Sequence, residues 1–361
     1  MTDIQDMILN TATKIMEDLC TKDVIHAAEQ GAWAGDLWNT LAEVGMTTIG
    51  IPEESGGAGG SLEDAMAVLR IAGRFSAPIP LAETLMANRL LSLSGLPVST
   101  DPLTVVPVVQ NEMIFAKKSS KGWVITGKAG QVPWAEKAKG IVVVANTDEQ
   151  PIIAFVDSNS CTIKPGINLA NEPRNEVVFQ DVFVENQLVA TVPFSTQTIY
   201  NLGALTRVVL MTGSLERILE LSVHYSKERS QFGKPIGRFQ AIQQQLAVLA
   251  GEVSAASIVT DFAVYAFESE YAKEEIMIAK IRVGNAVSTA VPIAHQVHGA
   301  IGFTDEYPLH HSTRRLWSWR DEFGTESEWA NDLGEMIIEN GPEKLWPFIC
   351  SSKSYSYERT V

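Results

Sequence analysis

The apolar positions of the chain change their period twice, and the changes divide it into three zones. In the first zone, before about residue 104, apolar residues recur at intervals of three and four, which places them on one face of a helix. We therefore predict an N-terminal helical domain over residues 1–103. The two clearest stripes are Ile4, Met7, Ile8, Ala12 and Ile15, and then Trp33, Leu37, Leu41 and Val44.

The second zone has short runs of β-branched and aromatic residues separated by Gly, Asn, Asp and Pro. The runs occupy residues 122–126, 140–145, 151–156 and 176–179, with no helix-length segment between them. This pattern predicts a small antiparallel β-domain over residues 104–195. It also excludes an alternating strand–helix array and the dinucleotide-binding fold built on one.

The helical period returns in the third zone, residues 196–361. A spacing that alternates three and four is typical of the seam of an antiparallel bundle, and wide apolar faces indicate packing against a second chain. We expect Pro292 to kink or break the later helix. The predicted fold class is therefore α+β, with an N-terminal helical domain, a middle antiparallel β-domain and a C-terminal four-helix bundle. The seam consists of Phe239, Ile242, Leu246, Leu249 and Val253.

A glycine-rich stretch at residues 56–60 ends the first run of helices. Four glycines in five residues predict a loop, and Ser61 with Asp64 resembles a helix N-cap and its third-position acid. A phosphate-cradling loop would need a preceding strand and a following lysine. Because Pro52, Glu53 and Glu54 make this stretch acidic, we favour the simple loop.

The amino-acid composition restricts the kinds of molecule that the chain can bind and the compartment in which we expect it. The net charge of −15 argues against nucleic acid, since binding a phosphate backbone needs clustered lysine and arginine. No run approaches the ~20 apolar residues of a membrane span. The first ten residues lack a basic region followed by an apolar run, so we expect no secretory signal and a cytoplasmic protein.

Cysteine and histidine give no sign of a metal centre. Cys20, Cys161 and Cys350 are far apart and odd in number, as expected of free thiols. His310 and His311 are adjacent, so their side chains point in different directions and make a poor ligand pair. We predict no metal.

Two segments of the third zone carry candidate ligand chemistry. The first, residues 228–236, joins two long helices and contains Arg229, whose planar fork suits a pyrophosphate oxygen. Taken alone, this arginine would be read as a surface ion-pair residue. In the second segment, residues 296–308, small residues at 299, 300 and 302 allow a ligand close to the backbone. An amide such as that of Gln296 suits a ribose or an adenine edge.

Together these segments resemble the acyl-CoA dehydrogenase family. The resemblance lies in Glu-Arg-x-x-Phe-Gly-Lys-Pro-Ile at 228–236, in Phe-Gln-x-Ile-Gln at 239–243 and in residues 296–308. Residues 52–59 and 177–184 also match the family, in the same order along the chain. The family implies an FAD across a subunit interface, an acyl-CoA substrate and reoxidation by an electron-transfer flavoprotein. In the family a carboxylate removes the α-proton while the β-hydride passes to the flavin.

The resemblance also implies which residues hold the cofactor. Arg229, Gln231 and Phe232 would bind the pyrophosphate and adenosine of a neighbour's FAD. The second segment would complete this half of the site. The further residues assigned to the cofactor are Gln296, Val297, Gly299, Ala300 and Thr325.

The family's catalytic base is missing at both of its usual positions. The family's Tyr-Glu-Gly-Thr motif falls on residues 322–325, where Phe323 occupies the position of the base. A minority of the family places the base just before an arginine on an early helix of the bundle, and here that position is Thr206. Glu322, one residue from the first position, is the remaining candidate base.

The β-domain departs from the family as well. The Thr-Glu-Pro and Gly-Ser-Asp residues that bind the flavin ring and thioester are absent after Asp101 and Pro102. Trp134 is the one counterpart we find there, for the family's tryptophan beside the flavin. The half of the site that faces the flavin ring is thus weakened, whereas the adenosine half is intact.

Three functions remain open on the sequence. The first is a degenerate partner subunit in a heteromeric α2β2 acyl-CoA dehydrogenase, resembling those acting on steroid or bile-acid side chains; residues 78–84 match that subgroup. The second is a self-sufficient homo-oligomeric enzyme in which Glu322 is a displaced base. The third is a non-catalytic scaffolding paralogue, which the matched flavin ligands argue against.

Overall fold

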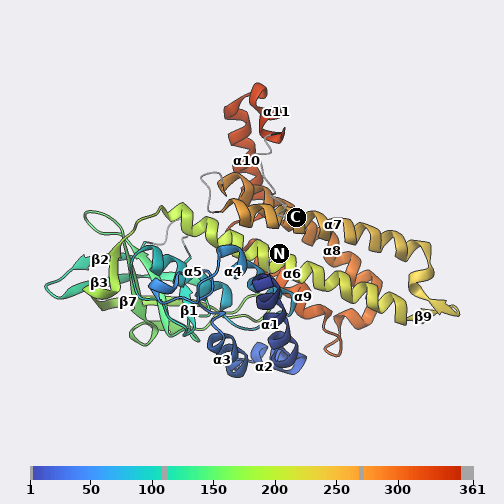
Figure 1. Ribbon diagram of the computed structural model, residues 1–361, viewed down its shortest axis with the longest axis horizontal. Helices are drawn as coiled ribbons and strands as arrows, with labels where there is room; N and C mark the ends of the chain where they lie inside the picture. Colours follow the sequence, from blue (N-terminus) through green and yellow to red (C-terminus); the bar gives the residue numbers. More distant parts are fainter. Residues whose placement is uncertain (1–2, 108–112, 268–271, 351–361) are drawn as a thin grey trace.

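The fold follows the predicted order of helices, strands and helices (Figure 1), in a computed structural model that describes residues 3–107, 113–267 and 272–350. The part of the first zone before Pro102 is helical. Its buried stripe on α3 is Leu37, Trp38 and Leu41, whereas Trp33 and Val44 lie outside the helix and are exposed, which corrects the predicted stripe. The helices are α1 (Asp3–Leu19), α2 (Lys22–Glu29), α3 (Gly35–Glu43), α4 (Leu62–Arg74) and α5 (Leu81–Leu93), with the 3-10 turn η1 (Glu53–Ser55).

The predicted cap at the start of α4 is confirmed. The Ser61 hydroxyl accepts from the Asp64 N–H at 3.1 Å, and the Asp64 carboxylate accepts from the Ser61 N–H at 2.9 Å. The preceding glycine-rich stretch is a closed loop, bridged between Ile51 and Gly59. A Cβ on Gly57 would meet the Ile51 carbonyl oxygen at 2.2 Å, so this glycine permits the close approach that closes the loop.

Two four-stranded sheets form the β-domain and enclose an apolar core. One is ordered β1–β4–β5–β8 and the other β2–β3–β7–β6. The predicted antiparallel pairing holds except between β1 and β4, which are parallel. The strands are β1 (Leu103–Val105), β2 (Phe115–Lys118), β3 (Gly122–Pro133), β4 (Gly140–Ala145), β5 (Ile152–Asp157), β6 (Thr162–Lys164), β7 (Arg174–Glu185) and β8 (Val189–Thr191), with the 3-10 turns η2 (Ser158–Ser160) and η3 (Asn186–Leu188).

The bundle is built on α6, a helix of 33 residues that runs from the β-domain to the far end of the bundle (Figure 1). On the predicted seam, Leu249 and Val253 are buried, and Phe239 precedes its helix. Pro292 lies inside α8 without ending it, so of the two expected outcomes, a kink or a break, the break does not occur. The helices are α6 (Thr196–Glu228), α7 (Gln240–Ala266), α8 (Ala272–His298) and α9 (Leu309–Asp321), with the 3-10 turns η4 (Ile236–Arg238) and η5 (Gly299–Phe303).

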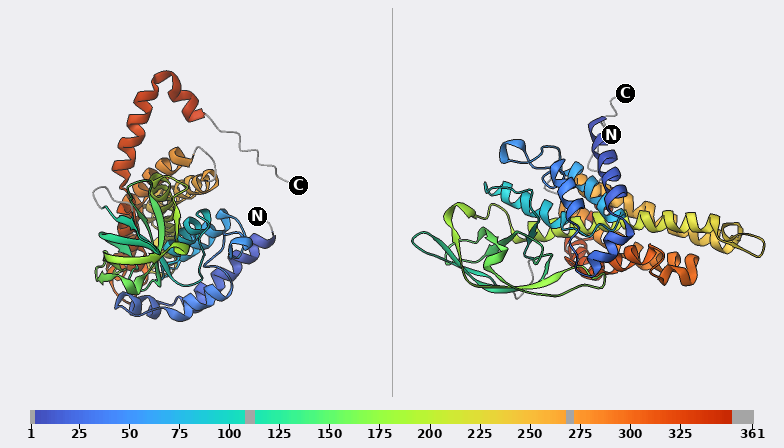
Figure 2. Two further views of the ribbon diagram at one scale, coloured as in Figure 1. Left: turned by 90° about the vertical axis from the view of Figure 1, so that its left-hand side faces the viewer. Right: turned by 90° about the horizontal axis from the view of Figure 1, so that it is seen from below.

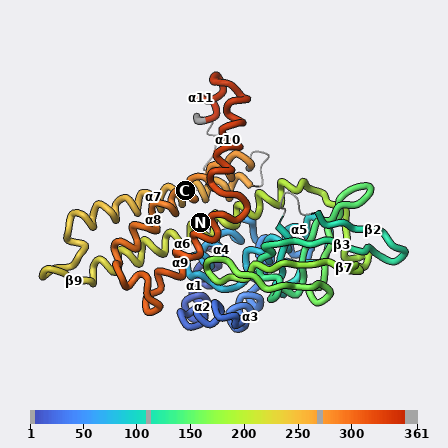
Figure 3. Tube along the Cα trace, turned by 180° about the vertical axis from the view of Figure 1, so that it is seen from behind, coloured from blue at the N-terminus to red at the C-terminus, as the bar shows by residue number. Residues whose placement is uncertain are grey.

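Strands are not confined to the middle zone. A small hairpin, β9 (Ser230–Gln231) with β10 (Lys234–Pro235), joins α6 to α7 at the far end of the bundle from the β-domain (Figures 1 and 3). The last two described helices, α10 (Glu326–Asn340) and α11 (Pro342–Cys350), form an arm that stands away from the body (Figure 2).

Two bundle helices are longer and more apolar than we expected from the sequence. The helical stretches 240–266 and 273–303 are long and apolar enough to span a membrane, with mean hydropathy of 1.5 and 1.2 over their most apolar windows. This corrects the expectation that no segment approaches that length. The core helices of a bundle meet the same criterion, and 56% of the second window is buried inside this molecule.

Candidate functional site

The fold brings the two predicted dinucleotide segments to one end of the bundle. Because α6 and α8 run in the same direction, with α7 returning between them, their last turns lie side by side. The ring of Tyr225, in the last turn of α6, stacks on the ring of His298, the last residue of α8, at 4.7 Å between centroids. We call this end, residues 229–233 and 296–300, the bundle tip.

The candidate ligands at the tip are open to solvent. Arg229, Gln231 and Gln296 are exposed, and within the described residues their side chains form no hydrogen bond or ion pair. Phe232 is 93% exposed and has a φ of 51°, a left-handed conformation that is rare for a bulky residue. Exposed apolar surface and backbone strain on the same residue are typical of a contact surface that another molecule completes.

Glycines keep the backbone of the tip accessible. Gly233 and Gly299 have φ values of 81° and 65°, and a Cβ added to either would meet no atom within 4 Å. Ala300 is exposed, whereas the Val297 side chain is buried and leaves only its backbone to a ligand. A guanidinium fork, two free amides and open backbone are the groups that a pyrophosphate and adenosine require, so the residues present fit an FAD half-site.

Thr325 lies elsewhere. Its hydroxyl caps α10 by accepting from the Glu328 N–H at 3.2 Å. The adjoining turn packs on Tyr200, which lies in the second turn of α6. The contact is so close that a Cβ on Gly324 would meet the Tyr200 hydroxyl at 2.4 Å. The stretch of α6 between Tyr200 and Tyr225 rises about 38 Å. Thr325 and the bundle tip of one chain are therefore too far apart to touch the same end of a ligand.

Both expected positions of the base meet at one turn of α6. The Phe323 ring packs on Gly203, where an added Cβ would meet it at 2.2 Å, and lies under the Arg207 guanidinium at 5.4 Å. Thr206, on the same turn, is fully buried and donates its hydroxyl to the Gly203 carbonyl at 2.7 Å. Neither side chain carries a carboxylate, so neither can act as the general base.

Glu322 is held by two arginines. One carboxylate oxygen accepts from Arg174 at 2.6 Å and the other from Arg207 at 2.6 Å. Burial would raise the pKa of Glu322, but the two guanidinium charges outweigh it and hold the pKa at about 2. A general base works best with a pKa near the operating pH and an oxygen that can reach the proton, and Glu322 has neither.

These two arginines belong to a larger buried network, which we call the junction lattice. Four arginines and four glutamates from all three zones alternate through it. Arg207 also binds Glu83 of α5 at 2.6 Å, and Arg174 binds Glu172 at 3.2 Å. The lattice fills the meeting point of the N-terminal helices, the β-domain and the bundle. Its charged members are Glu29, Glu83, Glu172, Arg174, Arg207, Arg314, Arg315 and Glu322.

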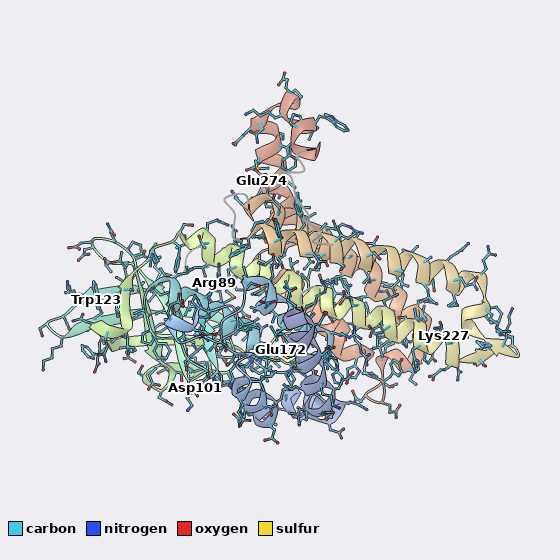
Figure 4. The ribbon with its side chains drawn as sticks, in the orientation of Figure 1. Arg89, Asp101, Trp123, Glu172, Lys227 and Glu274 are labelled. Atoms are coloured by element: carbon cyan, nitrogen blue, oxygen red, sulfur yellow. The ribbon has the colours of Figure 1, made fainter. Side chains whose placement is uncertain are left out.

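The lattice leaves little free space. A cavity lined by Glu83, Trp134, Arg174 and Arg207 has a volume of about 20 Å³. A neighbouring cavity beside Met86 and Leu202 has about 10 Å³. Each accommodates roughly one water molecule, whereas small-molecule sites usually offer about 300–1,000 Å³. Figure 4 shows the separation of the two places: Glu172 lies in the middle of the molecule and Lys227 beside the bundle tip at one end.

Sequence patterns did not predict the junction lattice. One signal was present: Arg207 interrupts an apolar run of α6, and a charged residue in a buried stretch is normally paired. Trp134, singled out as the counterpart of a tryptophan beside the flavin, is buried at this junction with a φ of 55°. The partners could not be read from spacing, because Glu83, Arg174, Arg207 and Glu322 are far apart along the chain.

Comparison with known proteins agrees with the sequence resemblance. Two family models match, the acyl-CoA dehydrogenase N-terminal domain over residues 2–95 and its C-terminal domain over residues 195–327. Acyl-CoA dehydrogenase IpdE2 of Mycobacterium tuberculosis is 30% identical over 300 residues, which cover 81% of this chain and 85% of that protein.

Two solved structures share the fold over nearly the whole chain. The ChsE4–ChsE5 complex from Mycobacterium tuberculosis has a chain that superposes with a TM-score of 0.86 at 20% identity, covering 94% of this chain and 98% of its own. The Tcur3481–Tcur3483 steroid ACAD gives a TM-score of 0.84 at 24% identity with the same coverage. Both sets of names denote assemblies of two different chains.

Proposed function

The chain belongs to the acyl-CoA dehydrogenase family, whose members are FAD-dependent oxidoreductases, and on that premise we propose that it acts as the partner subunit of a heteromeric enzyme. In this role the chain supplies the adenosine half of an FAD site. The other subunit supplies the flavin-ring pocket and the carboxylate that removes the α-proton of the acyl-CoA.

One contrast within the molecule carries this proposal. The bundle tip presents Arg229, Gln231 and Gln296 open to solvent and without partners among the described residues. At the junction, by contrast, the base positions hold Phe323 and Thr206, and the adjacent cavity has only about 20 Å³. One half of a dinucleotide site is thus ready for a ligand, and the other half is closed by the chain's own side chains.

Bound FAD would supply the acceptor for the substrate's β-hydride. This chain's contribution would be to hold the cofactor: the Arg229 fork faces a pyrophosphate oxygen, and the Gln231 and Gln296 amides face adenosine edges. The exposed ring of Phe232 would cover the adenosine and exclude water. Thr325, held at the junction, is assigned no contact with the cofactor bound at the tip.

We propose the substrate, the assembly and the electron acceptor from the similarity of this chain to its relatives. The substrate we propose is the CoA thioester of a bulky acyl group of the steroid side-chain type, in line with the named steroid enzyme of the same fold. The assembly we propose is α2β2, located in the cytoplasm, with an electron-transfer flavoprotein as the oxidant of the reduced cofactor.

The two alternatives have weaker support. A self-sufficient enzyme needs Glu322 as its base, yet both oxygens of that carboxylate are engaged by Arg174 and Arg207. A scaffolding paralogue has no need for exposed flavin ligands at the tip. The partner-subunit role accounts for both observations.

FAD stoichiometry tests the proposal. We expect the chain expressed alone to retain little FAD through gel filtration. Co-expressed with a family homologue that carries the base and the flavin-ring pocket, it should elute in a complex with half as many FAD molecules as chains. Full occupancy of the chain alone would contradict the partner-subunit role.

Arg229→Ala tests the tip directly. The substitution removes a charge-assisted contact worth about 1.5–3 kcal/mol, so FAD affinity of the complex should fall by roughly tenfold to a hundredfold. Arg238→Ala is the matched control, because Arg238 is also exposed at the α6–α7 connection but outside the tip. Equal affinities in the two variants would refute the role assigned to Arg229.

A further inference from the structure

Three aromatic rings pack together beneath the bundle tip. His298 is 3% exposed and stacks on Tyr225 at 4.7 Å with an interplanar angle of 26°. On its other side lies Tyr307, with ring centroids 4.9 Å apart, and the two tyrosines meet edge to face at 5.9 Å. The rings come from α6, α8 and the turn before α9, so the cluster joins three separate segments.

Hydrogen bonds fix the orientation of the histidine ring. Its Nδ1–H donates to the Ala294 carbonyl at 2.7 Å, which anchors the ring to its own helix. With that proton on Nδ1, Nε2 of the neutral ring can only accept, and the Tyr307 hydroxyl lies 3.2 Å from it. The one proton of this hydroxyl is shared between Nε2 and the Leu221 carbonyl of α6, which is 3.5 Å away. Both ring nitrogens therefore have a polar neighbour, one on α8 and one in the cluster, and the ring cannot turn without losing these contacts.

The cluster connects directly to both ligand segments. The Arg229 N–H donates to the Tyr225 carbonyl at 2.9 Å, so the position of the tyrosine sets where the arginine leaves the helix. His298 is bonded directly to Gly299, the glycine at which the second segment begins its left-handed turn. The stack thus fixes the separation between Arg229 and the backbone at residues 299 and 300.

We propose that His298 is a positioning residue for the adenosine half-site, holding the two ligand segments at the spacing that one FAD molecule requires. This inference rests on the proposed function of the tip and goes beyond it, because the His298 side chain is buried beneath the tip and is not one of the ligands assigned there. A misplacement of about 1 Å in a preorganised site is enough to weaken it strongly.

The test compares substitutions that remove the ring with those that keep it. His298→Ala removes two aromatic contacts, and His298→Phe keeps a ring in the stack. Thr212→Val is the control: it breaks the buried 2.7 Å hydrogen bond between Thr212 of α6 and Thr260 of α7. Thr212 is roughly 20 Å along α6 from Tyr225. FAD and ADP, which lacks the flavin, are titrated into the purified oligomer that contains the full-length chain. The thermal midpoint of each variant is also recorded.

We expect His298→Ala to raise the dissociation constants of both FAD and ADP by the same factor, about tenfold. His298→Phe should recover binding to within about threefold of wild type. Thr212→Val should lower the thermal midpoint without changing either constant. Should His298→Ala not fold, Tyr225→Leu and Tyr225→Phe provide the same comparison from the other side of the stack.

The outcomes separate the two proposals. If wild type binds neither FAD nor ADP, the half-site itself is refuted. If wild type binds both and His298→Ala binds them equally well, His298 has no positioning role. If His298→Phe is as weak as His298→Ala, the ring stack is not the positioning device and the inference falls.

Discussion

At the scale of single residues, Glu322 illustrates how surroundings decide the chemistry of a carboxylate. Its sequence position, next to the family's base, makes it a candidate base. Its contacts make it a counter-ion, because Arg174 and Arg207 each bind one of its oxygens at 2.6 Å. Removing one member of a buried ion pair leaves a buried charge uncompensated, which typically costs about 3–5 kcal/mol.

Glu322→Gln should therefore destabilise the protein rather than remove a catalytic step selectively. We expect a loss of about 3–5 kcal/mol in the free energy of unfolding by urea. Glu339→Gln, an exposed glutamate on α10, is the control and should change stability by less than about 0.5 kcal/mol. Wild-type stability combined with complete loss of turnover in the Glu322→Gln variant would instead identify Glu322 as a base.

Acid should unfold the protein through the same groups. Burial would raise the pKa of Glu29, but His311 and Arg315 outweigh it, so Glu29 and Glu322 both have a pKa of about 2 against an ordinary value of 4.5. A depressed folded-state pKa adds stability that is complete above the unfolded value and is lost as pH falls. Urea midpoints should therefore decline as pH falls from 4.5 towards 2, and less steeply in Glu322→Gln. Midpoints that stay level over this interval would contradict the lattice contacts.

At the scale of elements, α4 and α6 cross unusually closely. A Cβ on Gly213 would meet the Arg70 carbonyl oxygen at 2.0 Å, and one on Gly73 would meet the Leu210 carbonyl oxygen at 2.3 Å. The two glycines are reciprocal, each receiving the backbone of the other helix. The crossing packs the N-terminal helices closely against the bundle.

Gly213→Ala should separate these helices and cost at least about 1–3 kcal/mol, as overpacking of a core does. Gly334→Ala on α10 is the matched control, since a Cβ there meets no atom within 4 Å and should stabilise the helix by up to about 1 kcal/mol. Thermal midpoints of the two variants should thus move in opposite directions. A neutral Gly213→Ala would show that the crossing is looser than these distances indicate.

Helices and strands were predicted from the sequence more completely than the contacts between distant parts of the chain. Local patterns predicted the helical zones, the strands β3, β4, β5 and β7, and the cap at Ser61, because each depends on neighbours within a few residues. The parallel pairing of β1 with β4 was missed, since Leu103 and Gly140 are brought together only by the folded sheet. The lattice was missed for the same reason. The seam on α7 was only partly located: of its residues, Leu249 and Val253 are buried within this chain.

At the scale of the whole molecule, the bundle tip and the junction lattice lie far apart along the long helix α6. A site divided in this way is completed only by a second chain. We therefore expect light scattering of the purified protein at micromolar concentration to give a mass well above the 39.4 kDa of one chain. A monomer that retains FAD would contradict the half-site at the tip.

The measurement that tests the central claim most directly is turnover by the chain alone and with its partner. Acyl-CoA thioesters, including steroid side-chain esters, would be assayed with an artificial electron acceptor. Removing an α-proton needs a positioned base, which typically contributes about 10²–10⁴-fold, and neither Phe323 nor Thr206 can serve. We predict no turnover by the chain alone and clear turnover with the co-expressed homologue. Robust turnover by the isolated chain, abolished by Glu322→Gln while flavin stays bound, would contradict the account.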